Sequence, residues 1–176
     1  ADNNYVRFNT EPYGGPIYAS FMDKVLGVAG RLIVKGESGL ETKLVSFEDD
    51  VVIPNVAIHM NREMNTNLNL NPQVDMLPLF SLDKKHKLFD ENVLSHDLFL
   101  YNKEKGLVWG KDKEFVSSPK LDDLECAYAS IVAMKNQTPN EHLNISVVFN
   151  NEEVGSRSTT GAASNILEGL FKKLIE

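Results

Sequence analysis

The chain lacks two features that would point to an extracellular or membrane protein. It has one cysteine, Cys126, among 176 residues, which excludes a framework of intrachain disulfide bonds and suits a reducing compartment. No apolar run approaches the length of a membrane span, and the polar start at residues 1–4 differs from a signal peptide. We therefore expect a cytoplasmic protein without a membrane partner.

Positive charge is also scarce. Lysine and arginine number 18 against 25 aspartate and glutamate residues, which gives a formal net charge of −7. No basic cluster is interleaved with aromatic residues, so the sequence argues against a nucleic acid as partner. Hydrophobic residues make up 42% of the chain and charged residues 24%. This composition is that of a folded protein able to bury a core.

The first 110 residues are predicted to be mainly strands and loops. The predicted strands are 26–34, 51–54, 56–60 and 98–101, with a loop at 61–71 and a turn region at 103–113. Their short length and the intervening proline and glycine residues favour a β-rich region.

From Lys113 onward the pattern changes to alternating strands and helices. A short strand at 114–117 is followed by a helix with Asp122 or Asp123 as its N-cap. Residues 145–149 are almost continuously apolar, which predicts a strand of a parallel sheet buried on both faces. A last helix carries Ile166, Leu167, Leu170, Leu174 and Ile175. We expect a strand–helix–strand–helix order with a right-handed crossover.

Two pairs of carboxylates follow the two predicted strands, Asp122–Asp123 and Glu152–Glu153. Ligands of open α/β sheets collect beyond the carboxyl ends of the strands, so we expect the pairs to meet at one edge. A divalent cation would neutralise them and equip a metal-assisted hydrolase. Each pair alone also suits a simpler interpretation, a helix N-cap for the aspartates and a solvated loop for the glutamates.

Other chemistry has weaker support in the sequence. Residues 155–158 place serines where a nucleophile could lie, but the Gly-x-Ser-x-Gly spacing is not met, so a tight turn is the better interpretation. His59 ends a predicted apolar strand, where a histidine is more often a packed, hydrogen-bonded residue. No two histidines have the spacing of zinc ligands. A two-carboxylate glycosidase lacks the expected cluster of sugar-stacking aromatics.

Several sequence strings recur in the order seen in one enzyme family. They are YGG at 13–15, F-x-D-x-x-L-G-x-A-G-R at 21–31, I-P-x-x-A-I-H at 53–59, KEF-x-x-SP-K-LDDL at 113–124 and FNNEEVGSRS at 149–158. The chain resembles the M18 family of zinc aminopeptidases over nearly its whole length. The LDD and NEEVGS strings carry the most specific part of this resemblance.

The resemblance implies an α/β fold, part of a three-layer zinc-peptidase domain joined to a β-rich dimerisation insert. Residues 1–23 would lead into the catalytic domain, residues 24–110 would form the oligomerisation insert, and residues 111–176 would form part of the α/β catalytic domain. It further implies a homodimer or a dodecamer that hydrolyses the N-terminal residue, acidic or neutral, from peptide substrates with two Zn²⁺ per complete site.

The resemblance also implies roles for single residues. Asp122 would bridge the two zinc ions and Glu153 would be a terminal zinc ligand. Glu152 would be the general base that activates the attacking water. Asp123 would support the bridging carboxylate through an unusual, cis geometry of the Asp122–Asp123 peptide bond. His59, in the β-rich insert, would reach into the active site of a partner subunit.

The sequence departs from the M18 pattern at several points. No upstream histidine ligand motif is found, and the further aspartate and histidine ligands of the family have no counterpart after residue 158. Asn150 replaces an aspartate, and Ser20 stands where an aromatic residue is common. We expect a segment or a truncated relative that holds part of the metal site. The alternative function is an inactive dimerisation module.

Overall fold

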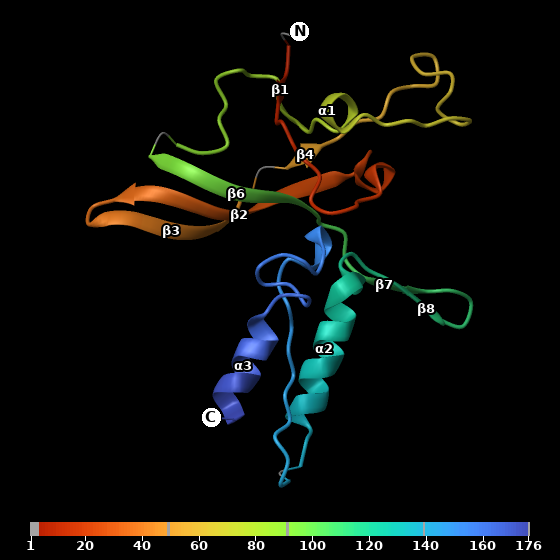
Figure 1. Ribbon diagram of the computed structural model, residues 1–176. Coiled ribbons are helices and arrows are strands. Elements are labelled where there is room, and N and C mark those ends of the chain that lie inside the picture. The colour runs from red at the N-terminus through yellow and green to blue at the C-terminus, as the bar shows by residue number, and fades with distance from the viewer. Residues whose placement is uncertain (1–3, 49, 91, 139, 176) are drawn as a thin grey trace. The chain divides into compact units, whose positions relative to one another are not determined.

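The computed structural model describes residues 4–48, 50–90, 92–138 and 140–175 (Figure 1). The polar start at residues 1–3 and one residue of the connection between the last two helices lie outside the described residues. The chain divides into two compact units. Unit 1 comprises residues 1–12 and 16–103, and unit 2 comprises residues 13–15 and 104–176.

The sheet of unit 1 is built around one long strand, β2 (Val25–Gly36). It pairs antiparallel with β3 (Gly39–Ser46) and, along its other edge, with β6 (Val93–Asn102). Gly36 pairs with Gly39, so β2 and β3 are joined by a two-residue turn. Gly39 has a φ of 136°, which a residue with a side chain rarely adopts.

Shorter elements complete unit 1. They are the strands β1 (Val6–Arg7), β4 (Val51–Val52) and β5 (Leu79–Ser81), the 3-10 helix η1 (Tyr18–Phe21) and the helix α1 (Pro72–Asp75). The strand order is β1-β5-β4-β2-β3, with β6 also paired to β2. Asn71 caps α1, because its side-chain oxygen accepts a hydrogen bond from the backbone N–H of Gln73 at 3.0 Å.

The core of unit 1 lies on one face of β2. Its buried cluster consists of Met22, Leu26, Val28, Val51, Ile53 and Met76. Leu26 is 0% exposed and Ile53 is 2% exposed, so these side chains are removed from water almost completely. The core thus joins β2 to the short strand β4, which precedes Ile53.

Most predicted strands of unit 1 are confirmed, but one is wrong. Residues 26–34 lie within β2, residues 98–101 lie within β6, and β4 covers the first half of 51–54. Residues 58–60 form a turn instead of the predicted strand, since the backbone N–H of Met60 donates to the carbonyl of Ala57 at 2.8 Å. Apolar composition alone therefore misled the prediction at 56–60.

The described residues of unit 2 form a hairpin and three helical segments. The hairpin pairs β7 (Leu107–Trp109) with β8 (Phe115–Ser117) antiparallel. The helical segments are α2 (Leu121–Lys135), the 3-10 helix η2 (Glu152–Val154) and α3 (Ile166–Ile175). Helix α3 confirms the predicted last helix, and β8 confirms the strand predicted at 114–117.

The predicted parallel strand pair is wrong. Residues 145–149 run as an extended segment (Figure 1) but pair with no strand in the described part of the chain. A lone extended segment has neither ladder hydrogen bonds nor cover on both faces, and Val148 is accordingly 54% exposed. Strand β8 pairs instead with β7, which lies in the predicted turn region 103–113. Strands and helices are both present, as in an α/β protein, without the expected crossover.

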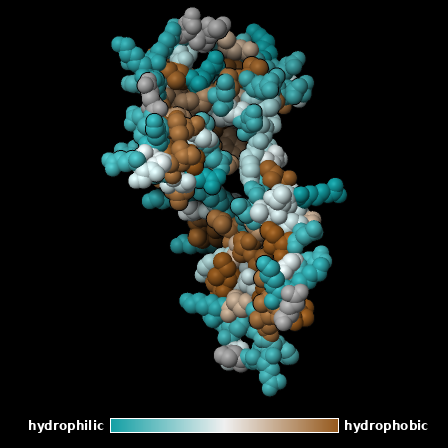
Figure 2. Space-filling view, turned by 60° about the vertical axis from the view of Figure 1, so that its left-hand side comes forward, coloured by the Kyte–Doolittle hydropathy of each residue, from teal (hydrophilic) through white to brown (hydrophobic). Residues whose placement is uncertain are grey.

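Many large apolar side chains of unit 2 are exposed. Figure 2 shows hydrophobic side chains gathered at the surface, and those of unit 2 include Leu124, Ile131, Val148, Leu170 and Leu174. The helices and the extended segment therefore keep apolar faces that the described residues do not cover. None of the helices in the described ranges combines the length and the apolar character needed to cross a bilayer.

Candidate metal centre

The backbone at Asp122 is irregular although the residue lies within α2. Its φ of −81° and ψ of 118° are extended, and the Asp122–Asp123 peptide bond is cis. The cis geometry expected at this bond is therefore present. The helix begins two or three residues earlier than predicted, after Lys120, which has a φ of 65°. Neither predicted N-cap occupies the cap position, yet Asp122 keeps the extended backbone that a cap residue usually has.

The two glutamates occupy a tight turn. Glu152 and Glu153 begin η2, which lies between Asn151, with a φ of 60°, and Gly155, with a φ of 94°. The backbone N–H of Gly155 donates to the carbonyl oxygen of Glu152 at 2.7 Å. Two residues with positive φ thus reverse the chain on both sides of the glutamates, as the turn interpretation of this segment predicts.

A distant segment supports this turn. The Tyr13 hydroxyl donates to Oδ1 of Asn151 at 3.3 Å, and Nδ2 of Asn151 donates to the hydroxyl of Thr160 at 2.8 Å. Gly14 approaches the backbone of Glu153 so closely that an added Cβ would overlap its carbonyl oxygen. The YGG string at 13–15 belongs to the family resemblance, which implies no role for it. The signal available was its two adjacent glycines, which are typical of a close backbone approach.

The side chains of the four carboxylate residues are exposed. Within unit 2, η2 and the first turn of α2 lie at the same end (Figure 1). Among the residues that the structure describes, no side chain gives these carboxylates a hydrogen bond or an ion pair. Carboxylate oxygens are established ligands of Zn²⁺, so Asp122 and Glu153 fit the chemistry of a zinc site. In the described ranges no three histidine, cysteine, aspartate or glutamate residues are grouped closely enough to hold a metal ion. The fit is therefore that of a partial ligand set.

His59 lies in unit 1, in the turn at 58–60, and its side chain is exposed. The predicted position at the end of an apolar strand is wrong, and so is the packed-core interpretation of this histidine. An exposed imidazole is free to approach another molecule. Its role toward a partner subunit stays a prediction.

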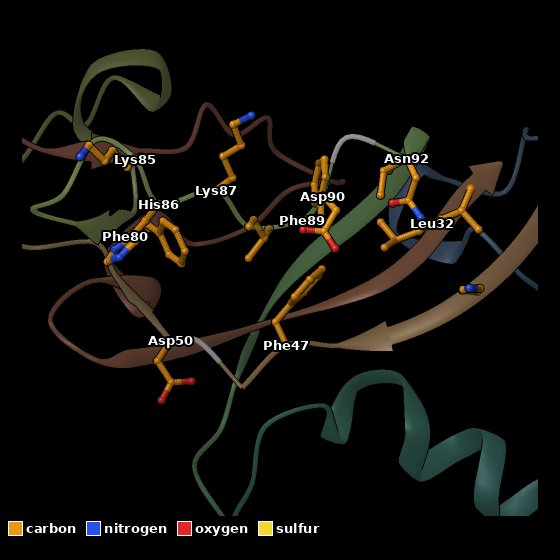
Figure 3. A pocket seen from close by; sticks show the side chains of 14 residues that line it. Leu32, Phe47, Asp50, Phe80, Lys85, His86, Lys87, Phe89, Asp90 and Asn92 are labelled. Atoms are coloured by element: carbon orange, nitrogen blue, oxygen red, sulfur yellow. The ribbon is translucent and has the colours of Figure 1, made fainter. Parts of the chain in front are cut away.

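One described pocket is lined by residues of unit 1 and by none of the carboxylates. It has a volume of about 850 Å³ and lies on unit 1, where Leu32, Phe47, Phe80 and Phe89 form its apolar part and Lys85 lies at its edge (Figure 3). None of the four carboxylates lines it. A metal site does not need a deep cavity within one chain, so ligand chemistry is the better guide to function here.

Comparison with known proteins decides the family. The profile of the family described as aminopeptidase I zinc metalloprotease (M18) matches residues 1–90 and 81–176. The chain belongs to the M18 family. Relatives named "probable M18 family aminopeptidase 2" from Clostridium acetobutylicum and Clostridium novyi are 39% and 41% identical to it. Both alignments cover 99% of this chain and 45% of the relative. The chain thus spans less than half the length of these M18 proteins.

Solved structures agree with this assignment. A chain in the cryo-EM structure of the Ape4 and Nbr1 complex superposes with a TM-score of 0.83 and 25% identity, covering 99% of this chain and 41% of that chain. The S. cerevesiae mApe1 dodecamer superposes with a TM-score of 0.70 and 25% identity, covering 98% of this chain and 43% of that chain. Both units therefore have the backbone of M18 proteins, which supports the resemblance found in the sequence.

Proposed function

We propose that this M18 chain is part of a zinc-dependent aminopeptidase that removes the N-terminal residue, acidic or neutral, from peptides. The observation that carries the proposal is the irregular backbone at both carboxylate pairs. Asp122 has an extended backbone within α2, and Glu152 and Glu153 lie in a turn held by positive-φ residues. Backbone of this kind is concentrated at functional sites.

We assign a separate role to each carboxylate. Asp122 and Glu153 would hold Zn²⁺, with two ions in the complete site. Bound Zn²⁺ would polarise the peptide carbonyl as a Lewis acid and acidify water. Glu152, whose carboxylate accepts no hydrogen bond from the described residues, takes the proton of the attacking water and passes it to the leaving amine. Asp123 positions Asp122 through the peptide bond that they share.

We further propose that the two units are a β-rich dimerisation insert and part of a three-layer α/β zinc-peptidase domain. The assembly is a homodimer or a higher homo-oligomer in the cytoplasm. The mApe1 dodecamer among the structural neighbours supports this choice. In the assembly, His59 of one subunit serves the active site of another, which its exposure in a turn of unit 1 supports.

One observation favours the alternative of an inactive dimerisation module. The described residues contain no group of three potential metal ligands, whereas catalytic zinc sites have three protein ligands. The alternative predicts a folded, assembling protein without hydrolytic activity.

An activity assay separates the two functions. The complete protein is incubated with short peptides that begin with Asp, Leu or Lys, and the release of the free first residue is measured. We expect release to stop after chelation, to return with Zn²⁺ and to fail for the N-acetylated peptide. Assembly without release from any of these peptides in the presence of Zn²⁺ would leave only the dimerisation module.

A further inference from the structure

Strand β3 is an edge strand of the unit 1 sheet, and each of its residues except the half-buried Val45 is exposed. Among the described residues it pairs only with β2 (Figure 1). Leu40 is 73% exposed and Leu44 is 84% exposed. Side chains of this size are costly to leave in water, and an unpaired strand edge presents a row of backbone donors and acceptors. The edge of β3 is therefore suited to pair with another strand.

The sequence of β3 is complementary to itself. Residues 40–44 read Leu-Glu-Thr-Lys-Leu. If two copies pair antiparallel about Thr42, each Leu40 lies opposite Leu44, and each Glu41 lies opposite Lys43. Both opposite-charge pairs and both leucine pairs form at once, because antiparallel partners are related by a two-fold axis.

The register of β3 on β2 places these side chains on suitable faces. Leu40 pairs with Lys35 and Leu44 pairs with Arg31 on one face of the sheet, whereas Lys43 pairs with Leu32 on the other face. The two leucines alternate with the two charged residues. In the paired form, four leucines would line one face of the seam, and two ion pairs would cross the other.

The charged residues are available for such contacts. Lys43 Nζ lies 3.9 Å from Glu41 Oε2 of the same strand, with side-chain exposures of 56% and 50%. This is a long, solvated pair that contributes little within one chain. Each partner is therefore free to bind its counterpart on a second copy.

We propose that β3 is a homodimerisation edge, where two copies of the chain pair antiparallel about Thr42 into one continuous sheet. The inference rests on the homo-oligomerisation proposed above and deepens it by naming the surface and the register. Charges on an edge strand often prevent pairing, but the order Glu41-Thr42-Lys43 attracts a second copy in this one register.

Charge reversal tests the register. In the 176-residue chain, Lys43→Glu alone sets Glu opposite Glu, and Glu41→Lys alone sets Lys opposite Lys. We expect the wild-type chain to sediment as a dimer and each variant to dissociate with a Kd raised about tenfold or more. An equimolar mixture of the two variants should dimerise again, because every pair across the heterodimer seam is then Glu with Lys. An interaction within one chain would not restore the dimer when the two variants are mixed.

Disulfide trapping tests the same register independently. In a Cys126→Ser background, which removes the free exposed thiol, Thr42→Cys places two sulfurs opposite each other. Opposed Cα atoms lie about 4.5–5.5 Å apart, which a disulfide bond spans. The matched control, Leu40→Cys, places its thiols more than about 10 Å apart along the seam. We expect rapid oxidation to a covalent dimer only for Thr42→Cys.

Each other outcome overturns the proposal. If the wild-type chain is monomeric, β3 is not a homodimerisation edge. A dimer that tolerates both single charge reversals, or that fails to reappear on mixing, assembles through another surface, and the proposed homo-oligomer then stands without β3. Unchanged far-UV circular dichroism spectra of both variants serve as the folding control, since both positions are exposed.

Discussion

Gly14 lies against the backbone of Glu153, although the two residues are 139 positions apart in the chain. Gly14 has a φ of 72°, and a Cβ at this position would overlap the Glu153 carbonyl oxygen. The neighbouring Tyr13 hydroxyl donates to Asn151. The tripeptide at 13–15 therefore belongs to unit 2 and fixes the position of a proposed zinc ligand.

The two adjacent glycines give a matched test of this contact. Gly14→Ala should lower the free energy of unfolding by about 1–3 kcal/mol, because it introduces both a left-handed alanine and a steric overlap. Gly15 has no atom within 4 Å of an added Cβ, so Gly15→Ala should leave the urea midpoint nearly unchanged. Equal effects of the two substitutions would refute a specific role for Gly14.

The core of unit 1 should depend on the buried face of β2. Leu26 is 0% exposed, so Leu26→Ala should lower the free energy of unfolding by about 2–5 kcal/mol. Its neighbour Val25 is 50% exposed on the opposite face, and Val25→Ala should cost about 1 kcal/mol or less. Urea denaturation of both variants measures the difference. Similar losses of unfolding free energy for the two variants would contradict a core that lies on one face of β2.

The ion pair between Lys103 and Asp50 should make stability depend on alkaline pH. Lys103 Nζ lies 2.6 Å from Asp50 Oδ1, and this hydrogen bond raises the pKa of Lys103. A raised pKa in the folded state means that the contribution is fully present below the ordinary lysine pKa. It is lost as pH rises through the raised value.

Replacing Asp50 isolates this contribution. Asp50→Asn should return the pKa of Lys103 toward its ordinary value in an NMR titration of the lysine side chain. The stability gap between wild type and Asp50→Asn should be open at pH 8 and shrink above the lysine pKa. A gap that stays constant over this range would assign the effect of Asp50 to another interaction.

The sequence predicts those elements whose pattern is set by local chemistry. Alternating and β-branched residues of β2 and β6 predict strands because one face is buried, and the periodic leucines of α3 predict a helix. The composition of the extended segment at 145–149 is that of a buried strand and so predicts a parallel sheet. Composition does not supply a neighbouring strand, and β8, the described strand that precedes this segment in the sequence, pairs with β7.

In the candidate site, too, the sequence predicts the local features and misses the long-range contacts. The motif residues Asp122, Glu152 and Glu153 are recognisable from the sequence, and the irregular backbone at Asp122 follows from the family resemblance. The support that Gly14 and Tyr13 give to the glutamate turn is a long-range contact, which no local pattern reports. His59 was misplaced because an apolar flank suggested a strand where the backbone turns.

Catalysis should be shared between subunits through His59. If its imidazole donates a hydrogen bond to the developing oxyanion, His59→Phe should lower kcat of the complete protein by about 10²-fold. Zinc content and assembly should not change. Mixing this variant with Glu152→Gln protein should restore part of the activity, because one site of the mixed dimer keeps both groups. If mixtures that exchange subunits regain no activity, His59 does not act in the active site of another subunit.

The division of roles between Glu152 and Glu153 tests the central claim most directly. Zinc content and turnover are measured together on the complete protein for Glu152→Gln and Glu153→Gln, which differ by one position in the same turn. We predict that Glu152→Gln keeps its zinc and loses about 10²-fold or more of its turnover, because a proton acceptor is removed and no ligand is. Glu153→Gln should lose zinc. Equal zinc loss in both variants, or full turnover in Glu152→Gln, would contradict the account.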